Sequence, residues 1–182
     1  MVSPQEVLTF WYQELEPKDW WVGGEALDLA IAERFGETVE AALRGELYGW
    51  RTTAEGRLAE IICLDQFPRN IYRGSAKAFA GDGLALVLTQ ELILSGIIKD
   101  LPEDRRNFAL MPLMHAESRA IHVWAAEVCV EAGATGLLDS LKEHSDVIEQ
   151  FGRYPSRNAA LGRPSTPEEL TYLKDGKSWG QG

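Results

Sequence analysis

Signals for the start of an α-helix recur along this chain, and no stretch has the alternating pattern of a β-strand. In the opening segment SPQEVLTFWYQEL, Ser3 can cap a helix, Pro4 suits the first helical position, and Glu6 completes a capping box. The segment STPEELTYLKDG repeats this pattern with Thr166 as the cap. Apolar residues recur at helical spacing between the two segments. We therefore expect an all-α fold of about eight or nine helices packed in antiparallel pairs.

Glycine and proline predict several helix boundaries. Residues 25–47 are typical of two short helices or one broken helix, because Gly36 separates two apolar periodic segments. Pro68 should end the helix through AEGRLAEIICLDQF, since proline lacks an amide donor and restricts the residue before it. By the same reasoning, Pro112 predicts an interruption in the helix that runs through RRNFALMPLMHAES.

Length and charge limit the class of protein and its partners. The 182 residues are 45% hydrophobic, which is enough for one substantial core, so we expect a single helical domain over residues 1–182 with a flexible tail at 173–182. Acidic residues outnumber basic ones 28 to 18, which argues against nucleic acid or an anionic membrane as a partner. The N-terminus resembles neither a signal peptide nor a membrane span, so we expect a cytoplasmic location.

Sequence signatures of metal and cofactor sites are missing. Cys63 and Cys129 lie in apolar stretches, where a thiol normally acts as a small buried hydrophobe. The three histidines, His115, His122 and His144, have no HExxH or Glu-x-x-His spacing around them. There is also no Walker-type loop and no Gly-x-Ser-x-Gly. We therefore expect no metal site and no cofactor.

An Arg-Asn pattern occurs twice, in QFPRNIYRGS at 66–75 and in RYPSRNAALGRPS at 153–165. One interpretation is structural: helix ends leave carbonyl groups without partners, and Arg and Asn side chains can donate to them. The other is that the two segments meet and form forked donors for a carboxylate or phosphate. This second interpretation gives as ligand-binding candidates Arg69, Asn70, Arg73, Arg153, Arg157, Asn158 and Arg163.

Histidines and carboxylates near these segments suggest a third possibility, an enzyme that acts on the bound ligand. His115 or His144 would be the general acid or base, Asp65 or Glu117 would orient it, and the arginines would stabilise negative charge. Asp65 and Glu117 are alternatively partners of the arginines in buried ion pairs. Because no nucleophile or metal constellation is recognisable, we favour binding of a small anionic ligand or an acidic peptide over catalysis. The sequence gives no indication of the oligomeric state.

Three segments carry a resemblance to a known family. In order, LDQFPRNIYRGSAKAFAGDGLAL, MPLMHAES and HSDVIEQFGRYPSRNAALGRPSTPEE resemble the hallmark segments of the bacterial domain of unknown function 924, over roughly Val7 to Tyr172. The resemblance implies an all-helical fold similar to tetratricopeptide-repeat stacks, with no established activity. This chain departs from the family pattern at Ala116, where relatives usually have Ser, and at Ser156, where they often have His. If these two positions serve acid-base chemistry in relatives, the same chemistry is not expected in this chain.

Overall fold

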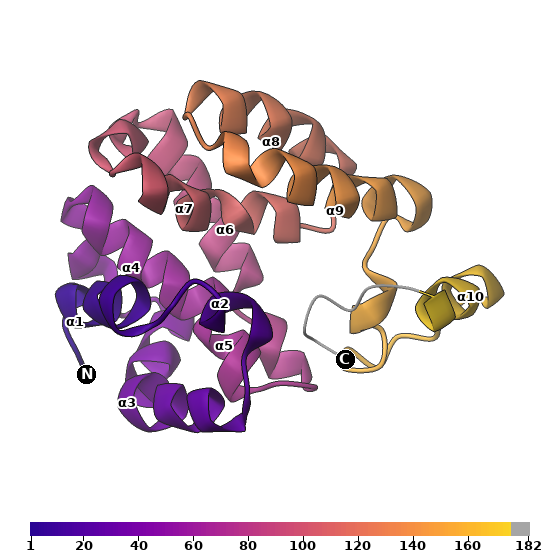
Figure 1. Cartoon of the computed structure of the whole chain (residues 1–182), viewed down its shortest axis with the longest axis horizontal. Helices are drawn as coiled ribbons and strands as arrows, with labels where there is room; N and C mark the ends of the chain where they lie inside the picture. Colours follow the sequence, from indigo (N-terminus) through magenta and orange to yellow (C-terminus); the bar gives the residue numbers. More distant parts are fainter. Residues whose placement is uncertain (176–182) are drawn as a thin grey trace.

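The computed structural model of the chain describes residues 1–175, and every regular element in that range is helical (Figure 1). The α-helices are α1 (Pro4–Thr9), α2 (Asp19–Val22), α3 (Glu25–Leu43), α4 (Ala54–Asp65), α5 (Phe67–Ile71), α6 (Asp82–Leu94), α7 (Glu103–His115), α8 (Arg119–Glu131), α9 (Leu138–Phe151) and α10 (Pro167–Asp175). A π-helix, Phe10–Glu14, continues α1, and short 3-10 helices lie in several connections. The expected all-α fold is confirmed, whereas the tetratricopeptide-like stacking remains a prediction.

The two predicted capping boxes are present. At the start of α1, the Ser3 amide donates to Glu6 Oε2 at 2.8 Å and the Glu6 amide donates to Ser3 Oγ at 3.3 Å. At the start of α10, the Thr166 amide donates to Glu169 Oε2 at 2.8 Å and the Glu169 amide donates to Thr166 Oγ1 at 3.2 Å. Each box satisfies amides that the first turn of a helix would otherwise leave without partners.

Two predicted interruptions are wrong. Helix α3 runs without a break through Gly36, and helix α7 runs without a break through Pro112. Residues on both sides of each position are buried, among them Phe35 and Val39 in α3 and the stretch 108–114 in α7. Packing of these apolar side chains therefore outweighs the local cost of a glycine or a proline inside the helix.

The break before Pro68 is confirmed, and it brings three helices together. Helix α4 ends at Asp65, and α5 begins at Phe67 with proline in its first turn, where no amide donor is needed. The residue before α6 is Gly81, and a Cβ atom there would lie only 2.3 Å from the Leu64 carbonyl oxygen. Only glycine allows the start of α6 to approach the end of α4 so closely.

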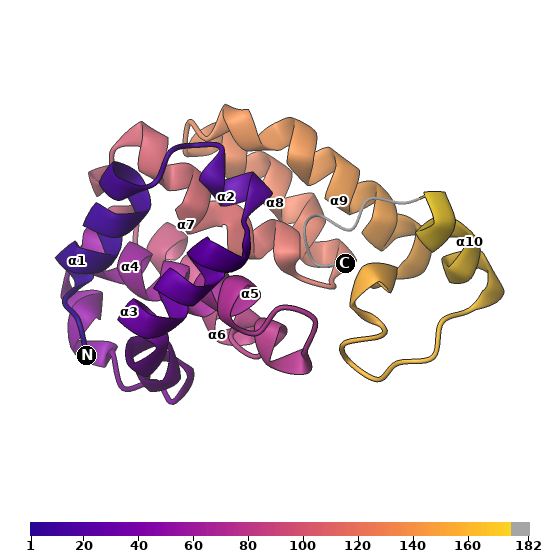
Figure 2. The same cartoon turned by 60° about the horizontal axis from the view of Figure 1, so that its bottom comes forward.

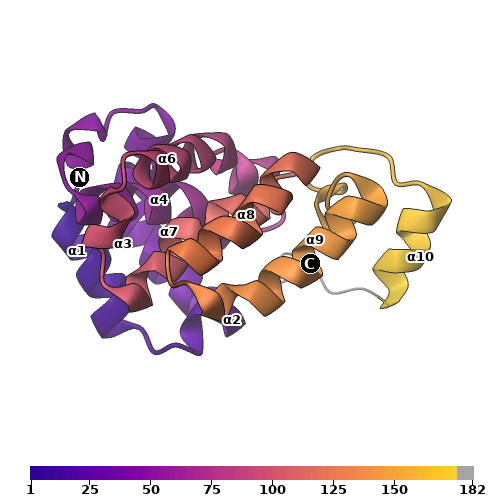
Figure 3. The same cartoon turned by 90° about the horizontal axis from the view of Figure 1, so that it is seen from above.

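Helix α4 lies at the centre of the main hydrophobic core. It packs against α1, α3, α6 and α7, and nearly every residue from Leu58 to Asp65 is buried. Helices α6 to α9 follow one another in space as they do in sequence, each against the next (Figure 3). A smaller apolar cluster around Tyr154 includes Val147 and Ile148 of α9, and Tyr172 of α10 packs against it.

Helix α10 lies at one end of the molecule, and a long connecting segment joins it to α9 (Figure 2). The predicted flexible tail began too early, because residues 173–175 form the last turn of α10. The rest of that prediction, residues 176–182, lies outside the described part of the chain. Over residues 1–175, no helix has both the length and the apolar character that crossing a lipid bilayer requires.

Candidate functional site

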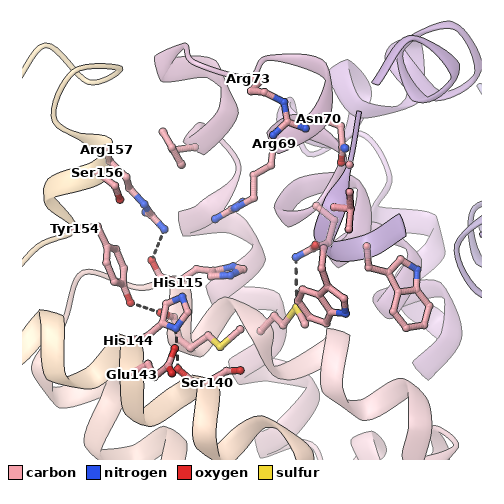
Figure 4. A pocket seen from close by; sticks show the side chains of 18 residues that line it. Arg69, Asn70, Arg73, His115, Ser140, Glu143, His144, Tyr154, Ser156 and Arg157 are labelled. Carbon is pink, nitrogen blue, oxygen red and sulfur yellow. Dashed lines mark hydrogen bonds between the residues drawn. The ribbon is translucent and has the colours of Figure 1, made fainter. Parts of the chain in front are cut away.

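A pocket of about 340 Å³ lies between α2, the α4–α5 junction, α7, α9 and the segment after α9 (Figure 4). This volume falls within the range of small-molecule sites. Both Arg-Asn segments contribute to it. The candidates from the sequence that line the pocket are Arg69, Asn70, Arg73, His115, His144 and Arg157.

Asp82, the first residue of α6, joins the two segments inside the structure. Its Oδ2 accepts a hydrogen bond from Arg157 Nη1 at 2.9 Å and another from Arg69 Nη2 at 3.0 Å. Its Oδ1 lies 3.0 Å from Arg69 Nη1. Both arginine side chains are only 11% exposed. One carboxylate thus holds two buried guanidinium groups side by side at the pocket.

His115 in the pocket lining forms a close pair with Asp65, which lies behind it. Asp65 Oδ1 lies 2.7 Å from His115 Nδ1 and 3.4 Å from Arg69 Nη1, and its side chain is 1% exposed. Burial acts to raise the pKa of Asp65, but Arg69 and His115 outweigh it and hold the pKa well below its usual value. Asp65 is therefore ionised and accepts the Nδ1 proton of His115. In neutral His115, Nε2 is then the ring nitrogen that can accept a proton.

His144 lies on α9, with its ring centre 6.2 Å from that of His115. Its Nδ1 donates to the Ser140 carbonyl oxygen at 2.7 Å. Burial first, and then the nearby His115, lower the pKa of His144 to about 4. Near neutral pH, His144 is therefore uncharged, and Nε2 is its unprotonated ring nitrogen.

Two aromatic rings hold Arg157 in place. Its guanidinium carbon lies 4.7 Å from the ring centres of both Phe79 and Tyr154. Its Nη2 donates to the His115 carbonyl oxygen at 3.0 Å. This bond and the one to Asp82 engage two of the five N–H donors of the group. Burial lowers the pKa of Arg157, but an arginine starts so high that the group stays charged.

At the rim, Arg73 and Asn70 of the first segment share one carboxylate. Arg73 donates from Nε and Nη2 to Asp28 of α3, both at 3.0 Å, and Asn70 Nδ2 donates to Asp28 Oδ1 at 2.7 Å. A Cβ atom at Gly23, just after α2, would lie 3.1 Å from Arg73 Nη2. The Arg73 side chain, at the rim of the pocket, therefore lies next to the end of α2.

Four of the candidates from the sequence lie outside the pocket, in a second polar cluster. Arg163 binds Glu117 through two hydrogen bonds of 2.6 and 2.9 Å. Arg153 binds Glu169 of α10 through two of 2.7 and 2.8 Å. Asn158 donates to Glu169 at 3.2 Å and accepts from Arg163 at 3.0 Å. The structural interpretation of the Arg-Asn pattern therefore fits this cluster, which joins α10 to the end of α7.

Comparison with known proteins agrees with the resemblance of the three segments. A family model described as bacterial protein of unknown function (DUF924) matches residues 7–177. The chain belongs to the DUF924 family. A solved structure, that of the protein of unknown function ATU0120 from Agrobacterium tumefaciens, is 39% identical, with a TM-score of 0.87. The match covers 95% of this chain and 97% of that one. A comparison with curated proteins finds no match.

Sequence reasoning missed the residue of this DUF924 protein that links the two arginines. Asp82 reads in the sequence as an ordinary acidic residue in the first turn of a helix, and nothing local indicates that α6 begins beside Arg69 and Arg157. The structure also places Trp20 and Trp21 in the pocket lining. Among the described residues, no group of three or more His, Cys, Asp or Glu side chains could hold a metal ion.

Proposed function

We propose that the pocket binds a small ligand through an anionic group, a carboxylate or a phosphate, beside Arg69 and Arg157. The observation that carries this proposal is their convergence: two guanidinium groups from distant segments meet on Asp82 at the pocket wall. Forked N–H donors suit carboxylate and phosphate oxygens. A volume of about 340 Å³ favours a small molecule over an acidic peptide.

The buried carboxylates determine how such a ligand would be accommodated. Asp65 and Asp82 offset the charges of Arg69 and Arg157, so they hold the guanidinium groups in position while further N–H donors serve the ligand.

Isothermal titration calorimetry with phosphate, acetate and citrate tests the proposal. At least one anion should bind and should raise the melting temperature by linkage. The change Arg157→Lys keeps the charge that balances Asp82 but removes the fork, so it should weaken binding by about tenfold or more. Arg44→Gln is the matched control, because Arg44 forms an exposed pair with Glu46 away from the pocket lining.

Two results would contradict the proposal. One is that none of the three anions binds the wild-type protein. The other is that Arg157→Lys and Arg44→Gln leave the affinity equally unchanged.

A second candidate function, acid-base catalysis on the bound ligand, is favoured by one specific contact. The distance of 2.7 Å between His115 Nδ1 and Asp65 Oδ1 is the arrangement that fixes the tautomer and orientation of a general base. A screen of aryl esters and aryl phosphates would test it. Hydrolysis should fall by about 10²-fold or more in both His115→Gln and Asp65→Asn. Unchanged rates in both folded variants would exclude His115 as the base.

A further inference from the structure

The wall formed by α2 is an exposed apolar surface that belongs to the pocket. Trp21 is 63% exposed and Val22 is 80% exposed, and both line the cavity. Single exposed apolar residues are common on protein surfaces, but apolar side chains gathered at a cavity indicate a binding surface. Trp20, in the same lining, is anchored instead, since its Nε1 donates to the Trp11 carbonyl oxygen at 3.0 Å.

The indole of Trp21 is exposed but not loosely placed. Its ring stacks on Phe108 of α7, with the ring centres 6.3 Å apart and the planes 18° from parallel. Helix α7 adds Met111 and Met114 to the same lining, and methionine adapts well to flat apolar groups. The pocket therefore offers a planar apolar contact on a rigid support.

The apolar wall formed by α2 and the arginine side chains line one continuous cavity. Gly23, with φ of +63°, follows α2 directly, and a Cβ atom there would lie 3.1 Å from Arg73 Nη2. In Figure 4, Arg157, Ser156 and Tyr154 lie on one side of the cavity and Arg73 and Asn70 on the other. A ligand can thus reach charged groups and the α2 wall at once.

We propose that the ligand is amphipathic: a planar apolar body, such as an aromatic ring, packs on Trp21 and Val22, and its acidic group reaches Arg157. This inference rests on the proposed function and specifies the chemical class as an aromatic carboxylate or an aryl phosphate. An inorganic anion would occupy only the polar end of a cavity of about 340 Å³ and would leave the α2 wall facing water.

Calorimetric titration of acetate, benzoate and 2-naphthoate, with 2-naphthalenemethanol as a neutral analogue, tests the inference. Affinity should rise by at least about tenfold from acetate to 2-naphthoate, because burying the ring removes apolar surface from water. If 2-naphthoate binds measurably and acetate does not, this result also supports the inference. Trp21→Ala should abolish most of the gain. The matched control is Tyr48→Ala, since Tyr48 is 74% exposed and outside the pocket lining.

The outcomes separate the inference from the proposed function. Equal affinities for acetate and 2-naphthoate, or an equal loss in Trp21→Ala and Tyr48→Ala, overturn the inference. If anion binding then still depends on Arg157, the proposed function stands. If the neutral analogue binds as tightly as 2-naphthoate and Arg157→Lys has no effect, both fail. If no carboxylate binds, the inference fails, whereas the proposed function fails only if phosphate does not bind either.

Discussion

The two Arg-Asn segments share a sequence pattern but differ in where their side chains go. The first, at 66–75, directs Arg69, Asn70 and Arg73 to the pocket. The second, at 153–165, places Arg157 there together with Tyr154 and Ser156, and its other arginines and its asparagine belong to the polar cluster that attaches α10. Similar donors thus serve a cavity in one region and a helix attachment in the other. The partner carboxylates, rather than the pattern itself, determine the role.

Removal of Arg69 is expected to have the largest effect. Its side chain is 11% exposed and contacts both Asp65 and Asp82. Arg69→Ala therefore leaves the buried Asp65 without its main counter-charge and Asp82 with Arg157 alone. We expect the free energy of unfolding to fall by about 3–5 kcal/mol. Urea denaturation measures this. The control is Arg44→Ala, which should lose little stability because water screens the exposed pair with Glu46. A loss of stability as small as that of the control would mean that Arg69 is not needed to balance the charges of Asp65 and Asp82.

Removal of Arg153 should have a smaller and more local effect. Arg153→Ala breaks two hydrogen bonds to Glu169 and one to the Pro164 carbonyl oxygen. We expect a smaller loss of stability than in Arg69→Ala, because Arg153 is partly exposed and water already screens its pair with Glu169. Limited proteolysis should show faster cleavage between residues 159 and 166, with ligand affinity at the pocket unchanged. A fall in ligand affinity would show that the pocket and the attachment of α10 are not independent of each other.

Acid should affect the two regions in different pH windows. Burial lowers the pKa of His144 to about 4, so the unfolded chain binds its proton more readily, and stability falls as the pH drops from about 6.5 to 4. The hydrogen bond from Arg153 is the main cause that lowers the pKa of Glu169 to about 2. Its stabilising contribution is complete above about pH 4.5 and is lost as the pH falls towards 2.

Each variant should reduce the slope in one window. His144→Gln should reduce it between pH 6.5 and 4, and Glu169→Gln should reduce it between pH 4.5 and 2. The slope that remains comes from other groups with a lowered pKa, among them His122 and Asp65. Each slope is at most about 1.4 kcal/mol per pH unit for a single proton. Urea titrations across both windows measure the slopes. If either variant flattened both windows equally, the two regions would not titrate independently.

The smallest effect is expected at the rim. Arg73 is 35% exposed and its partner Asp28 is 19% exposed, so water already screens this pair. Arg73→Gln should reduce stability by only about 0.5–1 kcal/mol. The same urea assay measures it, and a loss matching that of Arg69→Ala would show that the first segment acts as one unit rather than as a buried part and a rim.

The sequence predicted those parts of the fold that depend on neighbouring residues. The capping boxes of Ser3 and Thr166 are local hydrogen-bond patterns, and both are present. The breaks expected at Gly36 and Pro112 did not occur. At those positions, the outcome depends on helices that are distant in sequence and bury the flanking residues, and no local rule contains that information.

The candidate site was predictable to a similar degree. The repeated Arg-Asn pattern identified both segments, and six residues named from the sequence line the pocket. It did not separate Arg157 from Arg153 and Arg163, because all three have the same chemistry. Their separation depends on which carboxylates α6, α7 and α10 bring near, and therefore on tertiary structure.

The missing side chain at Gly81 has a consequence for recognition. With a Cβ position only 2.3 Å from the Leu64 carbonyl oxygen, two backbones touch where α4 ends and α6 begins, and that contact sets the depth at which Asp82 meets Arg69. A single methyl group here would push the two backbones apart and would move the Asp82 carboxylate away from Arg69 and Arg157. A residue without a side chain thus helps to set the positions of the charged groups at the cavity wall.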